Sequence, residues 1–191
     1  MRATSDPRYP HLPGESGVWV FILGDMLMFA AFFIVFMFYR SEDVALYVKS
    51  QLTLNQHLGA LNTFFMLTSS WCVAVAVEAA RGARPRGAQG WLLAAMSCAL
   101  GFVIVKFFEY REKILAGFTL TSNDFFMYYY MLTGLHLMHV LLGLGVLAYL
   151  WQCLRTPAGD TTLRTLESGA SFWHMVDILW IVLFALLYLV R

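Results

Sequence analysis

Two short motifs near the C-terminal end of the chain carry ionisable side chains inside runs that are otherwise apolar. In the first, Thr133-Gly-Leu-His-Leu-Met-His139, two histidines lie three positions apart. In the second, Phe172-Trp-His-Met-Val-Asp177, His174 and Asp177 have the same spacing. Ionisable groups are costly in a membrane unless they face a protein interior and find partners there, so these residues are the first candidates for function.

The histidines raise the question of a metal or haem site. Imidazoles three positions apart share one helix face, and neutral histidine is a common ligand of metals and of haem iron. One reading of the chain is therefore a stand-alone metal or haem enzyme that uses His136, His139 and His174. Helical-bundle proteins with two metal ions use Glu-x-x-His on two helices, whereas the spacings here are His-x-x-His and His-x-x-Asp. The spacing favours structural pairing between helices and leaves the metal or haem site open as the alternative.

Two pairs of opposite charge also have helical spacing. Lys106 and Glu109 lie three positions apart and predict an ion pair near the outer interface, supported by Lys113 four positions after Glu109. Glu78 and Arg81 predict a second pair at the inner interface, to which no function is assigned.

In hydrocarbon, polar groups on different helices must converge on one another. The sequence therefore favours an intramembrane network of hydrogen-bonded polar groups that includes Glu109, His136, His139, His174 and Asp177. Asp25 adds a lone carboxylate to the first apolar run. The second run is rich in hydroxyl and amide side chains, namely Asn62, Thr63, Thr68, Ser69 and Ser70.

Composition defines the class of protein that must position these groups. Of the 191 residues, 60% are hydrophobic and 13% are charged, against roughly 25% charged in soluble proteins. The mean hydropathy of +0.65 agrees with an integral membrane protein. A net charge of +1 gives no support for nucleic-acid binding, which needs a basic face. The cysteines, Cys72, Cys98 and Cys153, have no CxxC spacing and are expected to be packing residues.

Five apolar runs are each close to the ~20 residues that a helix needs to cross a bilayer. We predict an all-α fold, an integral membrane bundle of five transmembrane helices in a single domain over residues 1–191. A polar N-terminal segment, 1–16, precedes the bundle and is too polar for a secretory signal. All five prolines lie outside the spans, so the broken helices typical of a transporter are not indicated. The predicted helices span 18–39, 59–80, 91–110, 127–152 and 173–190.

The basic residues predict the orientation. With a cytoplasmic N-terminus, seven basic residues lie inside and five outside. The inner set is Arg2, Arg8, Arg81, Arg84, Arg86, Arg155 and Arg164, and the outer set is Arg40, Lys49, Arg111, Lys113 and Arg191. The positive-inside rule therefore predicts a cytoplasmic N-terminus and a periplasmic C-terminus. Aromatic residues near the ends of the runs are expected to form an interfacial belt, namely Tyr128, Tyr129, Tyr130, Trp91, Trp151 and Trp173.

Several of these motifs together resemble a known family. They are Lys106-Phe-Phe-Glu-Tyr110, then Thr133 to Val140 followed by Gly143, then Glu167 seven residues before His174. In order and spacing they are similar to the motifs of the haem-copper oxidase subunit III family. Cytochrome c oxidase subunit III is a member of that family. The resemblance extends upstream through Leu61-Asn-Thr-Phe-Phe65 and Gly24-Asp-Met-Leu-Met-Phe-Ala-Ala-Phe-Phe33, and so covers nearly the whole chain.

The resemblance implies a non-catalytic accessory subunit in a bacterial inner membrane. Such a subunit has no haem or metal of its own and packs beside a haem-bearing catalytic membrane subunit, which carries the haem and metal. It stabilises the catalytic subunit, supports electron transport or proton uptake, and can hold bound phospholipid among the membrane lipids around it. On this reading the five residues of the predicted network fix the helices relative to one another.

The chain departs from the family's long form in identifiable places. It resembles a five-helix form that begins where the third of seven helices would, with Asp25 at the position of the family carboxylate, usually Glu. Lys106 stands where Gln is common, and Leu137 stands where Gly is usual in the paired-histidine motif. The opening His11-Leu-Pro-Gly-Glu-Ser-Gly-Val-Trp19 resembles the five-helix NorE-like proteins associated with bacterial nitric oxide reductases and denitrification. The expected partner is therefore the catalytic subunit of an oxidase or of a nitric oxide reductase.

Overall fold

The described part of the chain is helical throughout. The computed structural model describes residues 16–82, 84–155 and 160–190, and these residues contain no strand. The all-α fold predicted from the sequence is confirmed. Fifteen of the residues in the predicted polar segment 1–16 lie outside the described residues. The helices are α1 (Ser16–Glu42), α2 (Val44–Gln51), α3 (Gln56–Arg81), α4 (Pro85–Leu115), α5 (Asp124–Cys153) and α6 (Asp160–Phe184), the last continued by a π-helical turn, η1 (Ala185–Leu189).

Five helices are long and apolar enough to cross a membrane, which confirms the predicted number. α1, α3, α4 and α5 extend beyond their predicted apolar runs at both ends, and the largest difference is at the start of α6, predicted from residue 173 but beginning at Asp160. Hydropathy marks the part of a helix that lies in hydrocarbon, whereas the polar turns at the water interface continue the same helix. The candidate spans are Gly17–Glu42, Gln56–Arg81, Pro85–Leu115, Asp124–Cys153 and Leu163–Leu189.

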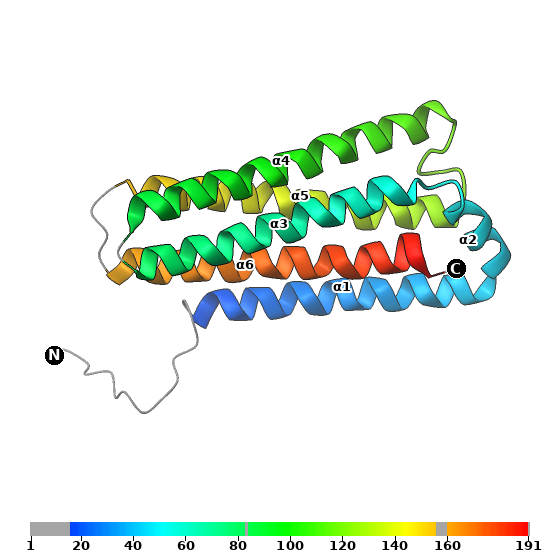
Figure 1. Ribbon diagram of the computed structural model, residues 1–191. Helices are drawn as coiled ribbons and strands as arrows, with labels where there is room; N and C mark the ends of the chain where they lie inside the picture. Colours follow the sequence, from blue (N-terminus) through cyan, green and yellow to red (C-terminus); the bar gives the residue numbers. More distant parts are fainter. Residues whose placement is uncertain (1–15, 83, 156–159, 191) are drawn as a thin grey trace.

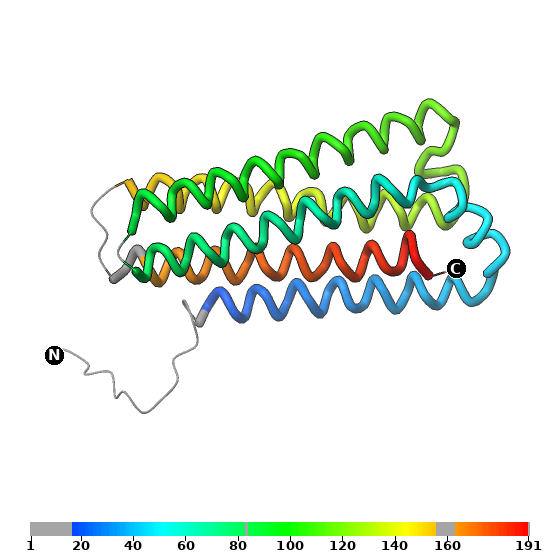
Figure 2. The backbone as a smooth tube through the Cα atoms, viewed as in Figure 1, coloured from blue at the N-terminus to red at the C-terminus, as the bar shows by residue number. Residues whose placement is uncertain are grey.

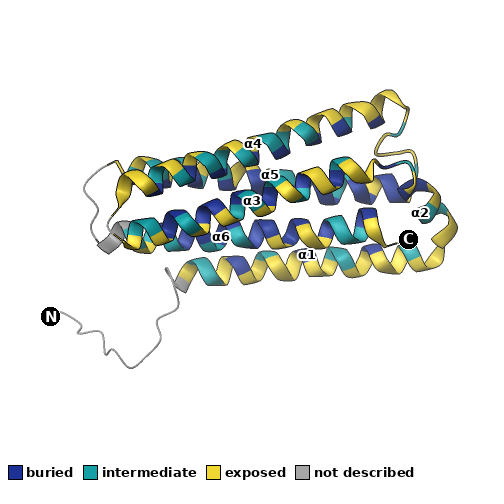
Figure 3. Cartoon of the chain, viewed as in Figure 1, coloured by how far each residue is buried: buried dark blue, intermediate teal, exposed yellow. Residues whose placement is uncertain are grey.

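Four of the long helices form a closed ring. Each of α3, α4, α5 and α6 packs against two neighbours, and α1 lies outside the ring against α6 and α5 (Figures 1 and 2). The contact face of α1 is narrow, because Ile22, Phe29 and Phe36, which are buried, lie seven positions apart as in a coiled-coil seam. Most of the remaining surface of α1 is exposed (Figure 3). In a membrane that surface meets lipid or another chain.

Small residues bring α5 and α6 into close contact. A Cβ atom at Gly143 would lie 2.6 Å from Cε3 of Trp173, and one at Gly169 would lie 2.6 Å from Cδ1 of Leu150. Neither distance is possible for a real side chain without movement of its neighbour. Glycine at these two positions therefore sets the separation of the two helices that carry the histidine motifs.

The short helix α2 was not predicted, because its eight residues are too few to give the signal of a membrane-spanning run. The Asp43 side chain caps the start of α2 by accepting a hydrogen bond from the Leu46 backbone N–H at 3.0 Å.

Residues at the same end of the bundle form hydrogen bonds with η1 and with Val190, which follows it. Gln51 Nε2 donates to the Leu186 carbonyl at 3.0 Å, and Arg40 Nη2 donates to the Val190 carbonyl at 3.1 Å. Burial raises the pKa of the Tyr47 hydroxyl on α2, and nearby Tyr128 adds to the rise.

Candidate functional site

The most deeply buried charged pair lies on α4. Lys106 Nζ is 2.9 Å from Glu109 Oε2, and both side chains are fully shielded from solvent. The predicted ion pair is confirmed, and it lies in the interior of the ring. The predicted support from Lys113 is wrong: Lys113 Nζ contacts Glu112 Oε1 at 3.0 Å and donates to the Thr53 carbonyl at 2.6 Å.

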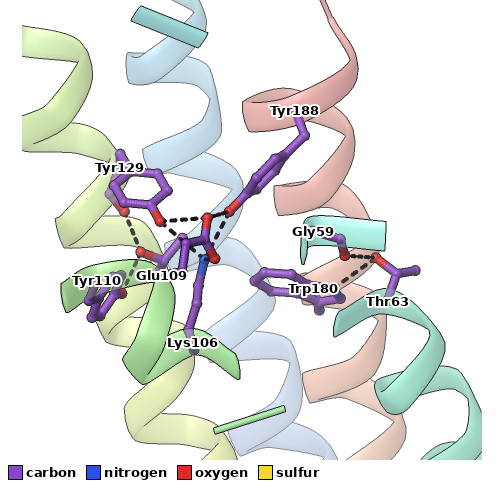
Figure 4. A network of polar contacts seen from close by, with 9 residues as sticks. Gly59, Thr63, Lys106, Glu109, Tyr110, Tyr129, Trp180 and Tyr188 are labelled. Atoms are coloured by element: carbon purple, nitrogen blue, oxygen red, sulfur yellow. Dashed lines mark hydrogen bonds and ion pairs between the residues drawn. The ribbon is translucent and has the colours of Figure 1, made fainter. Parts of the chain in front are cut away.

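Two tyrosine hydroxyls complete the surroundings of this pair (Figure 4). Tyr129 of α5 donates to Glu109 Oε1 at 2.9 Å, and Tyr188 of η1 donates to the same oxygen. Lys106 Nζ donates in turn to the hydroxyl oxygens of Tyr188 at 3.0 Å and Tyr129 at 3.4 Å. An ammonium group has three N–H donors, so Glu109 and the two hydroxyls give Lys106 one acceptor for each.

Aromatic rings enclose the ammonium group. Four ring centroids lie between 5.0 and 5.5 Å from Lys106 Nζ. The rings belong to Tyr110, Tyr129, Trp180 and Tyr188. A cation over an aromatic face gains roughly 2 kcal/mol when it is desolvated. Lys106, Glu109, Tyr129, Trp180 and Tyr188 are together called the Lys106 cluster below.

The Lys106 cluster reaches all four helices of the ring. Its α4 residues contact Tyr129 on α5 and Trp180 on α6, and Trp180 Nε1 donates to Thr63 Oγ1 on α3 at 3.1 Å. Thr63 Oγ1 also donates to the Gly59 carbonyl at 3.0 Å, one turn earlier in α3. These contacts hold the four helices together. The polar groups of the Lys106 cluster form their hydrogen bonds with other residues inside the bundle. Figure 4 shows the side chains pointing toward one another from their separate helices.

A second group joins α1 to α5. His139 Nδ1 lies 2.8 Å from the Leu135 carbonyl of its own helix, and because a carbonyl only accepts, this nitrogen carries the hydrogen. The other ring nitrogen, Nε2, faces Asp25 Oδ2 at 3.4 Å. That distance allows an ion pair but exceeds the range of good hydrogen bonds. Phe29 packs edge-on against the His139 ring, with centroids 5.4 Å apart.

A third group joins α3 to α6. Ser70 Oγ lies 2.6 Å from His174 Nδ1, and the Ser70 hydroxyl also interacts with the Asp177 side chain. Asp177 is buried, and its Oδ1 atom has no hydrogen-bond partner among the residues that the structure describes. The hydroxyl-rich character of the second apolar run thus supplies the partner of the His174 motif.

His136 differs from the other predicted network residues. It is fully buried, and neither ring nitrogen has a hydrogen-bond partner within the described ranges. Its ring packs against Phe102 at 5.7 Å and against Trp180 at 5.3 Å between centroids. The described contacts therefore place Glu109, His139 and the His174–Asp177 motif in three separate groups, with His136 packed beside the Lys106 cluster.

Sequence reasoning missed the aromatic partners of these groups. Tyr129 and Trp173 were expected in an interfacial belt, but both are fully buried inside the bundle, so that expectation is wrong for these two residues. Tyr188 and Trp180 were not singled out. A tyrosine hydroxyl within an apolar run needs a partner just as a charged group does, and this signal points to Tyr129 and Tyr188.

The histidines are not gathered at one point. His139 faces Asp25, His174 faces Ser70, and His136 packs against aromatic rings. Among the described residues no group of three or more His, Cys, Asp or Glu side chains is arranged to hold a metal ion. The three histidines of the alternative reading are therefore not placed to bind one metal ion together.

The sequence matches the family model of cytochrome c oxidase subunit III over residues 14–190. The chain belongs to this family. The match covers α1 to η1, and so includes every helix that positions the polar groups described above.

Relatives in this family agree with the match. The chain is 29% identical to cytochrome c oxidase subunit 3 of Synechocystis over 97% of its own length and 84% of that protein. It is 28% identical to subunit 3 of the cytochrome bo(3) ubiquinol oxidase of Buchnera aphidicola, over 91% of the chain and 84% of that subunit. It is also 28% identical to the haem-copper oxidase subunit I+III of Aeropyrum pernix, over 92% of the chain but only 22% of that longer protein.

Because the chain belongs to this family, its general function is that of a membrane-embedded subunit III of the haem-copper oxidases. The prediction made from the motifs in α4, α5 and α6 is therefore confirmed. The narrower resemblance to accessory proteins of nitric oxide reductases is not tested by these relatives, and it stays a prediction.

Proposed function

We propose that this chain is a non-catalytic subunit that packs against the haem-bearing catalytic subunit of its complex, stabilises it, and supports its proton uptake and electron transport. The haem and metal belong to the catalytic partner. The name of the Aeropyrum pernix relative, subunit I+III, is the observation that carries the partner assignment. A protein named for both subunits indicates that the two parts work side by side.

The polar groups support a structural role for the bundle. The Lys106 cluster, the Asp25–His139 contact and the Ser70–His174 contact each join different helices. We propose that Glu109, His139, His174 and Asp177 hold the helices in place and that His136 fills the space beside Trp180. The exposed face of α1 is then available to lipid or to the catalytic subunit.

The orientation is part of the proposal. The odd number of candidate spans, five, supports a position of the two ends of the described chain on opposite sides of the membrane. The basic turn with Arg81, Arg84 and Arg86 supports a cytoplasmic position for the α3–α4 turn, and hence a cytoplasmic N-terminus and a periplasmic C-terminus in a bacterial inner membrane. Reporter fusions at the α3–α4 turn and after residue 191 would test this: a periplasmic signal from the first fusion contradicts it.

Purification of the tagged chain from its native membranes in mild detergent tests the proposed function. Mass spectrometry identifies the proteins that co-purify, and a visible spectrum is taken of the chain after it is separated from them. We expect a haem-bearing catalytic subunit and a colourless separated chain. The identity of that subunit distinguishes an oxidase from a nitric oxide reductase. A solitary chain that carries its own haem or metal contradicts the proposal.

A further inference from the structure

An open depression of about 640 Å³ lies at the turn between α3 and α4, away from the three polar groups described above. Val75 and Trp91 line its apolar part, and Glu78, Arg81 and Arg84 line its polar part. Arg81 ends the α3 span and the α4 span begins at Pro85, so the polar part lies at the membrane surface.

The charges in this depression are not equivalent. Arg81 Nε and Nη2 both donate to Glu167 Oε1, at 3.0 and 2.7 Å, so the charge of Arg81 is already compensated. The predicted Glu78–Arg81 pair is therefore wrong. Glu78 and Arg84 are exposed, and neither forms an ion pair within the described portion of the chain. The depression thus offers one unpaired carboxylate and one unpaired guanidinium group.

A zwitterionic headgroup complements this pair of charges. Guanidinium groups bind phosphate oxygens through two parallel hydrogen bonds, and a carboxylate accepts hydrogen bonds from an ammonium group. An anionic headgroup without an amine satisfies Arg84 but leaves the Glu78 carboxylate facing the phosphate without a counter-charge. Charge complementarity therefore favours a lipid that carries both a phosphate and an amine.

The apolar part leads from the headgroup position toward the acyl chains. The Trp91 ring packs edge-on against Trp71, with centroids 5.4 Å apart. Trp71 is 59% exposed on the surface of α3. Tryptophan is enriched at the boundary between headgroups and hydrocarbon, where its ring packs against lipid and its N–H stays near polar groups.

We propose that this depression is a binding site for phosphatidylethanolamine, with the phosphate on Arg84 and the ammonium group on Glu78. The lining residues in the described part of the chain all lie on α3, on α4 or in the turn between these two helices. It goes beyond the proposed accessory function and does not depend on the identity of the catalytic partner.

The test measures lipid binding to the purified full-length chain in detergent by native mass spectrometry, with phosphatidylethanolamine and phosphatidylglycerol of the same acyl chains added in equal amounts. We expect the wild-type chain to bind phosphatidylethanolamine more strongly. Loss of one charge-assisted hydrogen-bonding partner should weaken that binding roughly tenfold in both Arg84→Gln and Glu78→Gln. Glu78→Gln should also reverse the preference in favour of phosphatidylglycerol.

Arg86→Gln is the matched control, because Arg86 lies in the same turn, is exposed and does not line the depression. We expect it to bind both lipids as the wild type does. Arg84 makes no side-chain capping bond to α4, so its substitution should leave the thermal unfolding temperature unchanged. Equal binding of the two lipids by the wild type, or equal weakening by Arg84→Gln and Arg86→Gln, would overturn the proposal in favour of general attraction to the membrane surface.

Discussion

Glu109 accepts a hydrogen bond from Tyr188, although the two residues are 79 positions apart in the sequence and lie on different helical elements. The acceptor belongs to the fully buried ion pair with Lys106. This contact therefore connects the π-helical turn η1 to the only ion pair that is fully buried in the described part of the protein.

Substitution of Glu109 by Gln should strongly destabilise the bundle. It leaves the Lys106 ammonium group buried without its counter-charge, and breaking a buried ion pair in this way costs about 3–5 kcal/mol. The midpoint of thermal unfolding in detergent, measured by circular dichroism, should fall clearly. Glu112→Gln is the control, because the Glu112 side chain is exposed and its buried partner Lys113 keeps a hydrogen bond to the Thr53 carbonyl, so the cost should be less than about 1 kcal/mol.

The double variant Lys106→Met with Glu109→Gln should recover much of the loss, because both charges are removed and the space is filled by apolar or neutral groups. The comparison of single and double variants gives the coupling between the two residues. A double variant as unstable as the two single variants added together would show that the ion pair is not the source of the effect.

Gly143→Ala should disturb the packing of α5 against α6. The new Cβ atom would lie 2.6 Å from the Trp173 ring, which is fully buried and has little room to move. We expect a cost of about 1–3 kcal/mol from overpacking. Gly145→Ala, two residues away, has no atom within 4 Å of its new Cβ and should be neutral or slightly stabilising. Unfolding midpoints that do not differ between the two variants would contradict this prediction.

His174→Ala should weaken the contact between α3 and α6 by about 1–2 kcal/mol at most, the range measured for interhelical hydrogen bonds in membranes. Ser70→Ala removes the other partner of the same bond. If the Ser70–His174 bond carries the effect, the double variant should be less destabilised than the sum of the single variants. Unchanged thermal stability of His174→Ala would count against a structural role for this contact.

Asp25→Asn should leave assembly with the catalytic subunit intact. The amide has nearly the same shape as the carboxylate and can still contact His139 Nε2. Co-purification of the partner measures assembly, and the rate at which the complex loses activity during turnover measures a functional role. Slower or faster loss with normal assembly assigns a function to the carboxylate, whereas failed assembly shows that Asp25 is structural and that the prediction is wrong.

Regularities along the chain predicted the membrane helices and their polar faces. Apolar runs of about twenty residues identified the five spans, and the three-residue spacing of Lys106 and Glu109 identified a pair that the structure contains. Both signals depend only on residues that are close in sequence. The hydrogen-bond partners on other helices depend on how far each helix is shifted and rotated against its neighbour, and spacing within one helix does not contain that information.

The arginine at the end of α3 illustrates this limit. Arg81 has Glu78 one turn earlier on its own helix, but it binds Glu167 of α6 through two nitrogen atoms. Two charge-assisted hydrogen bonds to one carboxylate stabilise the structure more than a single ion pair along an exposed helix face does. Tyr129 is a second case, since its position near the end of an apolar run suggested an interfacial residue, whereas its hydroxyl is used by Glu109.

The hydrogen bond from Arg40 to the Val190 carbonyl has a consequence for biogenesis. Arg40 lies near the C-terminal end of α1, and its acceptor is synthesised 150 residues later. The other contacts of α1 within the membrane are also with α5 and α6, which leave the ribosome after α1. Because α1 is synthesised before α5 and α6, it must stay in the bilayer, held by its own hydrophobicity, until those helices have followed and its docking site exists.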